Sequence, residues 1–386
     1  MRISLLAGAA TSCVAVLLLQ STAVSTAVST AVADPAPAEQ TSAGGGTVTS
    51  MSLTAAEHTV TQRATKPFSL IGVSWDDPRQ SLAGTSIRVR THRVSTGAWT
   101  AWRPLAVENE DAPDERDGRS GIRGSTAPLW TGPSDGVAVE VTPGPKGLPA
   151  GLRVELVDPG RGAASASAVR VLPAETAAAR TPQDHEAPRP GIVTRAGWGA
   201  DESLRETGFV YTGTVKAVFV HHTDTATDYA CSDAPQMIRA IYQYHVQSNG
   251  WRDIGYNFLV DRCGTIYEGR AGGVSQPVLG AHTLGFNSDS AGVAALGTFT
   301  TEGPPQEIVD GISKIAAWKL GLTGQDAAGH TNLTSGSSQS RYPKGTVVSF
   351  DTVSGHRDAF ATECPGDGLY ARLDDIRSWA AHLQGR

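Results

Sequence analysis

The chain has 386 residues, of which 40% are hydrophobic and 18% are charged. This length and composition are typical of a soluble protein with two ordinary domain cores, and they exclude a chain that is disordered throughout. The formal net charge is -6 and no run of basic residues stands out, which argues against a nucleic-acid partner.

The N-terminus has the pattern of an export signal. Arg2 precedes an apolar stretch over residues 3–19, and small residues then continue to Ala33. This pattern predicts a signal peptide over residues 1–33, because the apolar stretch is short for a bilayer span. We therefore expect a secreted protein that has no membrane contact after cleavage. Residues 34–66 are rich in Ala, Thr, Ser and Gly and predict a flexible segment without a core.

Residues 67–173 show the alternation of half-buried strands. Apolar and polar residues alternate at 87–90, 137–141 and 152–156, between clusters of Gly, Pro and Asp. This period of two predicts a small all-β, sandwich-like domain. Its four tryptophans could stack on sugar rings, although large aromatic side chains in a compact β domain more commonly fill the core. They are Trp75, Trp99, Trp102 and Trp130.

A linker rich in Ala and Pro is predicted over residues 174–190, and the pattern changes after it. Residues 215–220 predict a strand buried on both faces, and 256–260 with 265–268 predict a hairpin around the Cys263-Gly264 turn. Apolar residues at helical spacing predict three helices, over 233–248, 307–320 and 369–383. Residues 191–386 are therefore expected to form an α/β domain, with a central mixed β-sheet flanked by helices.

Three cysteines remain after signal cleavage, and an odd number in an oxidising compartment needs an explanation. Metal binding by Cys364 is one explanation, and it leaves Cys231 and Cys263 to form a disulfide. The alternative is that Cys364 pairs with one of the other two.

Histidine and cysteine in distant segments suggest a zinc site. His221 and His222 end a predicted strand, and His356 and Cys364 lie close together near the C-terminus. Two imidazoles and one thiolate suit a zinc ion that keeps a fourth position open for water, as in metal-assisted hydrolysis. Neighbouring strand residues point to opposite faces, so only one of His221 and His222 can reach the ion, and the apolar pattern does not choose between them.

Six blocks in this part of the chain together resemble the peptidoglycan recognition protein family, whose zinc-binding members are N-acetylmuramoyl-L-alanine amidases. The resemblance covers about residues 195–383 and leaves the β domain outside. The blocks are Arg195-Ala-Gly-Trp-Gly-Ala200, Val220-His-His-Thr223, Gly250-Trp251 with the residues to Val260, Tyr267-Glu-Gly-Arg270, Gly280-Ala-His-Thr-Leu-Gly-Phe-Asn287, and Gly355-His-Arg-Asp358 with Thr362-Glu-Cys-Pro-Gly366.

The resemblance implies roles for five residues. It assigns the zinc ligands as His221, His356 and Cys364. It places Tyr256 beside the metal, where the phenol can hydrogen-bond the oxygen that becomes negative during amide hydrolysis. Thr362 occupies a position near the reacting water, and we expect it to orient groups there because a hydroxyl is a weak proton donor.

The same resemblance implies a substrate groove lined by His222, Thr223, His245, Trp251, His282 and Asn287. Gly250-Trp251 resembles the pair found in members that prefer a diaminopimelate stem peptide. Asp289, where such members often carry arginine, and the long loop over 271–278 leave the choice between diaminopimelate and lysine open.

The resemblance therefore implies a monomeric, secreted and cell-wall-associated zinc enzyme that cleaves the amide between N-acetylmuramic acid and L-alanine in peptidoglycan. Two alternatives stay open from the sequence. One is a non-catalytic module that recognises peptidoglycan, and the other is a zinc peptidase that cuts within the stem peptide.

Overall fold

The computed structural model describes residues 38–41, 45–54, 58–80, 82–106, 111–114, 117, 120–162, 170–175 and 185–386. Residues Pro37–Arg386 form one compact unit. The predicted signal peptide lies outside the described residues, as does much of the predicted linker. Among the helices in the described ranges, none has the length and apolar character needed to cross a membrane.

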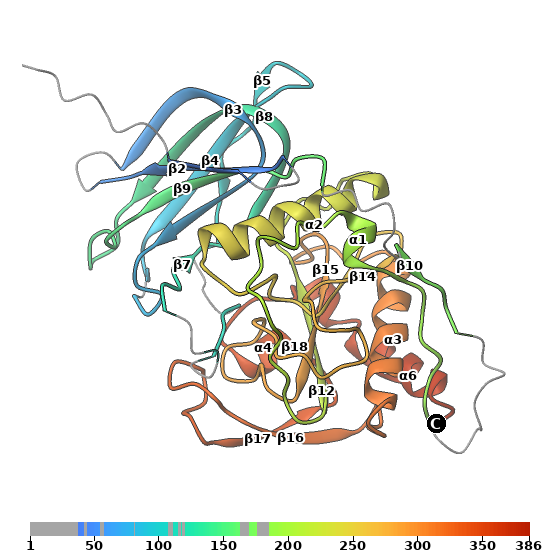
Figure 1. The fold of residues 1–386 in the computed structure, drawn as a ribbon. Coiled ribbons are helices and arrows are strands. Elements are labelled where there is room, and N and C mark those ends of the chain that lie inside the picture. The colour runs from blue at the N-terminus through green and yellow to red at the C-terminus, as the bar shows by residue number, and fades with distance from the viewer. Residues whose placement is uncertain are drawn as a thin grey trace, which may run out of the picture. The chain divides into compact units, whose positions relative to one another are not determined.

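The N-terminal part is built on an antiparallel sheet with the strand order β1-β2-β9-β3-β8-β4-β5 (Figure 1). On β4, Ile87 and Val89 are buried whereas Arg88 is exposed, so the alternation in the sequence follows the faces of the sheet. The predicted all-β character of this part is confirmed. The strands are β1 (Ala38–Thr41), β2 (Thr47–Ser52), β3 (Thr59–Trp75), β4 (Ser86–Arg93), β5 (Ala98–Trp99), β6 (Arg103–Pro104), β7 (Gly124–Ser125), β8 (Leu129–Thr142) and β9 (Arg153–Asp158).

Strand β2 corrects the expectation of a flexible, coreless segment over residues 34–66. It pairs with β9 along its whole length, and the side chains of Val48, Met51 and Leu53 are buried. The many Thr and Ser residues dominate the composition, but the pairing satisfies their backbone groups and only a few apolar side chains need to enter the core. The prediction from composition alone therefore missed this strand.

The four tryptophans of the N-terminal part divide into two kinds. Trp75 is 1% exposed and Trp130 is 5% exposed, so both fill the core. Trp99 and Trp102 are half-buried, and the Arg90 guanidinium lies 5.5 Å and 4.8 Å from their ring centres. The core interpretation therefore holds for two of the four.

The C-terminal part has a mixed sheet in the order β10-β11-β14-β13-β15-β12-β18, beside a hairpin of β16 and β17. The predicted hairpin is present as the antiparallel pair β13–β14, and β12 runs parallel to both β15 and β18. The predicted mixed sheet is confirmed. The strands are β10 (Val171–Leu172), β11 (Ile192–Val193), β12 (Ala217–His222), β13 (Phe258–Val260), β14 (Ile266–Glu268), β15 (Ser290–Ala295), β16 (His330–Thr334), β17 (Val347–Asp351) and β18 (Val353–Gly355).

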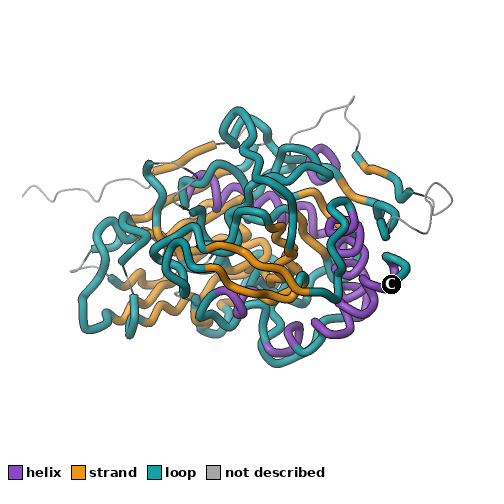
Figure 2. Tube along the Cα trace, turned by 90° about the horizontal axis from the view of Figure 1, so that it is seen from below, coloured by secondary structure: helices purple, strands orange, loops and turns teal. Residues whose placement is uncertain are grey.

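Helices cover both faces of this sheet, as Figures 1 and 2 show. Helices α3 (Gln306–Gly321) and α6 (Leu373–Leu383) share a core with Val218 and Val220 of β12. Helix α2 (Ala234–Gln243) packs with side chains that point to the opposite face, such as Ala294 of β15. The predicted helix over 233–248 continues past α2 as a π-helical turn, η4 (Tyr244–Ser248).

The two parts of the compact unit share a hydrophobic core. Leu70 and Trp130 of the N-terminal sheet pack in one cluster with Met237 and Ile241 of α2. The Tyr244 hydroxyl donates to backbone carbonyls of the N-terminal part, at 3.2 Å to Val73 and 3.0 Å to Thr126. The N-terminal sheet is therefore packed against the α/β part through side chains of α2 and η4.

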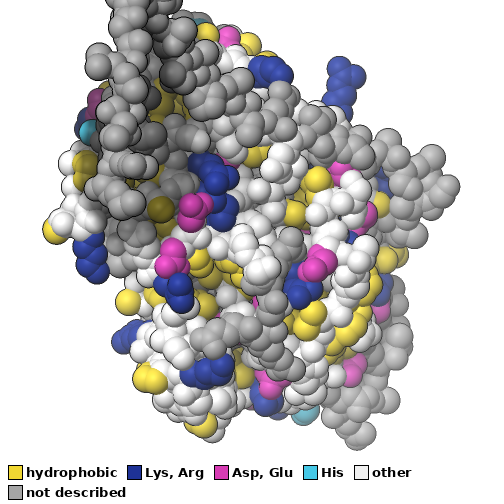
Figure 3. Space-filling model, turned by 60° about the vertical axis from the view of Figure 1, so that its left-hand side comes forward, with side chains coloured by type: hydrophobic (Ala, Val, Ile, Leu, Met, Phe, Trp, Pro, Cys, Tyr) yellow, Lys and Arg dark blue, Asp and Glu magenta, His cyan; other side chains and the backbone are white. Residues whose placement is uncertain are grey.

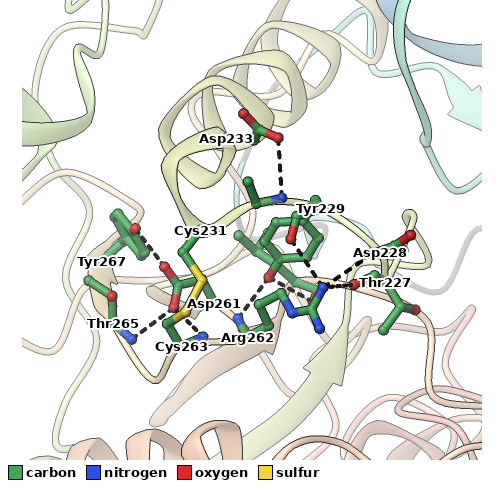
Figure 4. The surroundings of a disulfide bond; sticks show 12 residues. Thr227, Asp228, Tyr229, Cys231, Asp233, Asp261, Arg262, Cys263, Thr265 and Tyr267 are labelled. Carbon is green, nitrogen blue, oxygen red and sulfur yellow. Dashed lines mark hydrogen bonds and ion pairs between the residues drawn. A yellow bond between two sulfur atoms is a disulfide. The ribbon is translucent and has the colours of Figure 1, made fainter.

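The predicted disulfide between Cys231 and Cys263 is confirmed (Figure 4). It joins the segment before α2 to the turn between β13 and β14. Asp261 accepts hydrogen bonds from the backbone of Cys263 and from the Tyr267 hydroxyl, and the Arg262 backbone donates to the Tyr229 hydroxyl. Cys364 is buried and lies outside the disulfide, so the alternative pairing is wrong.

Basic and acidic side chains are interspersed on the face of the molecule in Figure 3. One lysine is instead buried. Lys319 on α3 is 3% exposed, and its ammonium donates to the carbonyls of Val274 and Gln276, both at 2.8 Å. It thereby holds the loop over residues 271–278.

Burial of Lys319 makes stability depend on pH, because burial lowers the pKa of this lysine to about 7. The unfolded chain keeps a lysine pKa of about 10.4, so it binds more protons than the folded chain between these values. The free energy of unfolding should therefore rise from pH 7 to pH 9, with a contribution approaching about 1.4 kcal/mol per pH unit. Urea unfolding at several pH values should show this rise in the wild type and a smaller slope in Lys319→Met. The exposed Lys314 on the same helix gives the control, since Lys314→Met should keep the wild-type slope.

Candidate metal centre

The centre lies where parallel strands end. β12 is buried throughout and carries His221 and His222 at its carboxyl end. β18 pairs beside it, with Val220 opposite Gly355, and the next residue, His356, begins the short helix α4 (His356–Ala359). Carboxyl ends of parallel strands meet at one edge of a sheet, which brings His221 and His356 together.

Three candidate ligand atoms converge at this edge. His221, His356 and Cys364 each offer one nitrogen or sulfur atom within 4.8 Å of the others. The Cys364 sulfur lies 3.8 Å from Nδ1 of His221. The histidines are at most 1% exposed and Cys364 is 9% exposed, so the set is shielded from solvent.

This set fits zinc. Two nitrogens and one sulfur around a tetrahedral zinc ion lie roughly 3.3–3.6 Å apart, given its usual bond lengths. Neither ring nitrogen of His356 has a hydrogen-bond partner among the described residues, and an unsatisfied buried donor or acceptor is costly. Burial lowers the pKa of His356 to about 3, which keeps the imidazole neutral, as a metal ligand must be.

Thr283 positions the ring of His221, although the sequence motifs did not identify it as a site residue. Thr283 Oγ1 lies 3.3 Å from Nε2 of His221 and 3.0 Å from Nδ1 of His282. A hydrogen bond at Nε2 orients the ring and leaves Nδ1 directed at Cys364. Thr283 lies within the block from Gly280 to Asn287, and its position next to His282 was the available signal.

His222 takes a different direction from His221, as alternation along a strand requires. Its ring Nδ1 accepts a hydrogen bond from the backbone of Phe299 at 3.3 Å, and its own backbone N–H donates to the Cys364 sulfur at 3.4 Å. Burial lowers the pKa of His222 to about 4, so the ring is neutral. The imidazole of His222 is therefore engaged outside the ligand set.

Tyr256 and Thr362 lie beside the candidate ligands. The ring centres of Tyr256 and His221 are 5.5 Å apart, and the Tyr256 hydroxyl donates to Asp111 at 2.5 Å. Burial and the charge of Asp111 raise the pKa of Tyr256 well above its usual range, so the phenol keeps its proton. Thr362 accepts a hydrogen bond from the Cys364 backbone at 3.1 Å, which orders the turn that carries the thiol.

A pocket opens to solvent beside the centre. The rings of His245 and Trp251 lie 4.4 Å apart in its wall, and burial lowers the pKa of His245 to about 3. Six of the residues predicted to contact substrate or assist catalysis line it, together with His356 and Cys364. These six are His222, Thr223, His245, Trp251, Tyr256 and Thr362.

The other two predicted substrate contacts, His282 and Asn287, lie behind the pocket wall. Both are 0% exposed. The Asn287 side chain accepts hydrogen bonds from the backbone of His282 and Thr283 and donates to the Ala112 carbonyl. Their direct contact with substrate stays a prediction.

Asp289 stabilises the segment that precedes β12. It is the residue that stands where diaminopimelate-binding members often carry arginine. Its side chain accepts hydrogen bonds from the Gly213 backbone at 2.9 Å and from the Lys216 ammonium at 3.0 Å. Its own backbone has a φ of 57°, in the left-handed region that aspartate tolerates better than most residues. Asp289 is therefore engaged with the segment that precedes β12.

Two family models match the chain. Residues 211–367 match N-acetylmuramoyl-L-alanine amidase, and residues 17–189 match the Rv3811 N-terminal galactose-binding domain-like family. Peptidoglycan-recognition protein SC2 of Drosophila melanogaster is 31% identical over 192 residues, which are 49% of this chain and 86% of that protein. The chain belongs to the peptidoglycan-recognition protein family.

Proteins named as amidases are also similar to this chain. The N-acetylmuramoyl-L-alanine amidase of Homo sapiens is 32% identical over 204 residues, which are 49% of this chain and 28% of that protein. Among solved structures, Drosophila PGRP-LB is 28% identical with a TM-score of 0.38, and the match covers 49% of this chain and 94% of that one. Peptidoglycan recognition protein-LE in complex with tracheal cytotoxin is 27% identical with a TM-score of 0.38, and the match covers the same shares.

The family model and the sequence relatives place the protein among peptidoglycan amidases and recognition proteins. The N-terminal family match fits a bacterial member. The family contains both named enzymes and proteins named for recognition, so membership alone leaves the catalytic status of this chain undecided.

Proposed function

We propose that this protein is a secreted, zinc-dependent N-acetylmuramoyl-L-alanine amidase. Its reaction adds water across the amide that joins the lactyl group of N-acetylmuramic acid to L-alanine, and it leaves a free carboxylate on the sugar and a free amino group on the peptide. The observation that carries the proposal is the convergence of His221, His356 and Cys364 at a buried strand edge, beside a pocket.

Zinc would supply a Lewis acid that polarises the amide carbonyl and acidifies water. The residues of the chain have separate tasks. Thr283 holds the His221 ring, and Tyr256 keeps its proton and can donate it in a hydrogen bond to the oxygen that becomes negative during hydrolysis. Thr362 orders the turn of Cys364.

The pocket wall suits a sugar joined to a short peptide. The ring of Trp251 lies against that of His245 and offers an apolar surface, while the His245 imidazole and the Thr223 hydroxyl offer polar groups. A substrate of this kind needs both types of contact. We infer that the muramyl peptide lies along this wall with its amide near Tyr256.

Digestion of purified sacculi tests the proposal and separates the three candidate functions. With zinc-loaded protein, mass spectrometry should find new L-alanine amino ends without new reducing sugar ends, and a zinc chelator should abolish them. New ends inside the stem peptide would favour a peptidase. Tight binding to sacculi without any new ends would favour recognition alone.

A further inference from the structure

The N-terminal part contributes a carboxylate to the metal centre. Asp111 lies on the segment between β6 and β7, far from the amidase-like region in sequence. Its Oδ1 is 3.3 Å from Nδ1 of His221 and 3.3 Å from Nδ1 of His356. Its Oδ2 accepts the hydrogen bond from Tyr256, whereas Oδ1 is buried without a hydrogen-bond partner among the described residues.

Asp111 Oδ1 has the separations from the two histidine nitrogens that a fourth ligand of a zinc site would have. Around a tetrahedral zinc ion, an oxygen ligand and a nitrogen ligand lie roughly 3.3 Å apart. The separations of Asp111 Oδ1 from Nδ1 of His221 and from Nδ1 of His356, both 3.3 Å, match this value. Charge agrees as well, because one carboxylate and one thiolate balance the two positive charges of Zn²⁺.

Neighbouring residues of the segment anchor Asp111 in this place. Asp114 accepts hydrogen bonds from the Gly285 backbone and the Asn287 side chain, and the Ala112 carbonyl accepts one from Asn287. Asp117 accepts a hydrogen bond from Arg252 at 2.7 Å. These contacts join the segment to the residue after Trp251 and to the block from Gly280 to Asn287, which belong to the groove that the family resemblance implies for substrate.

The segment also covers apolar surface of that groove. Ala112 is buried in a cluster with Trp251, Ala281 and Leu284, and Ile122 packs against it. Residues expected to meet a muramyl peptide, Trp251 and Asn287, therefore contact the N-terminal part instead. A ligand on these two residues and the segment would compete for the same surface.

We propose that Asp111 is a fourth zinc ligand and that the segment 111–114 is an intramolecular inhibitor of the amidase site. A zinc ion with four protein ligands has the closed coordination of a structural site, and catalysis needs one position open. The protein as folded here is thus a latent form. Full activity requires the carboxylate to leave the centre and the segment to leave the groove, and the wild type keeps the lower activity that transient departure of the segment allows.

This inference depends on the proposed zinc amidase, and zinc affinity provides a readout that is separate from turnover. In the full-length protein, Asp111→Ala should raise the zinc dissociation constant at least about tenfold in competition with a chromophoric chelator. The cobalt-substituted variant should show an altered visible absorption spectrum, because water replaces a carboxylate. Turnover of a soluble muramyl peptide at saturating zinc should rise roughly fivefold or more.

Two further variants separate ligation from covering of the groove. Asp114→Ala loosens the segment but keeps the Asp111 carboxylate, so it should raise turnover and change zinc affinity less than Asp111→Ala. Asp77→Ala removes an exposed acid of the N-terminal part and should change neither quantity.

Three results would overturn the inference. Unchanged zinc affinity in Asp111→Ala would remove the ligand assignment while leaving the amidase proposal intact. A fall in turnover of the same variant at saturating zinc would show that Asp111 assists the reaction instead of blocking it. A wild-type protein that binds no zinc would refute the proposed function itself.

Discussion

Cys364→Ser should bind zinc far more weakly and lose amidase activity by roughly a thousandfold. The thiolate is one of the three converging ligand atoms, and a serine hydroxyl is a much poorer zinc ligand at neutral pH. Loss of the ion removes a Lewis acid worth several kcal/mol in the transition state, and each 1.4 kcal/mol corresponds to about a tenfold change in rate. Zinc content after dialysis and single-turnover rates on a muramyl peptide would measure both effects.

Two controls keep this result specific. The wild type, stripped with a chelator and given zinc again, should recover its rate, whereas Cys364→Ser should not. Thermal unfolding and the intact Cys231–Cys263 disulfide would establish that the variant is folded. Wild-type turnover by a folded Cys364→Ser protein would refute the role of the thiol.

Tyr256→Phe should reduce kcat about a hundredfold to a thousandfold and leave zinc affinity within a few-fold of the wild type. The phenol is protonated and lies beside His221, where it can stabilise the oxygen that becomes negative. Removal of one such donor in a shielded site typically costs about 10²–10³ in kcat. Because the interaction forms mainly in the transition state, KM should change little.

The same variant also bears on Asp111, because the Tyr256 hydroxyl donates to its carboxylate. The effects of Tyr256→Phe on kcat, KM and zinc affinity are therefore best measured again in an Asp111→Ala background, where the phenol has no carboxylate partner. Tyr211→Phe is the matched control, since Tyr211 is exposed and its hydroxyl bonds to the Gly272 carbonyl. An equal loss in both tyrosine variants would indicate a general structural effect.

Local patterns predicted most of the C-terminal elements. Apolar periodicity placed the helix at 307–320 within one residue of α3 at each end, because that helix buries a wide stripe against the sheet. The helix expected over 369–383 is instead two, α5 (Asp367–Tyr370) and α6, since residues 371–372 end the first turn before Leu373. The odd cysteine correctly indicated that Cys231 and Cys263 pair.

Motif blocks also indicated which residues to examine in the site, and the structure brings His221, His356 and Cys364 together as that pattern suggests. The choice between His221 and His222 could not come from hydrophobicity, because β12 is buried on both faces. Strand direction and the contact with Thr283 distinguish them.

Sequence patterns were sufficient to predict the local chemistry, namely the histidine and cysteine side chains, the strand that carries His221 and His222, and the Cys231–Cys263 disulfide. The distant groups that meet these residues became apparent from the folded chain alone. Asp111 belongs to a segment with no motif, and nothing in its sequence distance of 110 residues from His221 predicts a separation of 3.3 Å. Such a contact depends on how the N-terminal sheet packs against α2, and packing of this kind arises from the shapes of many buried side chains at once.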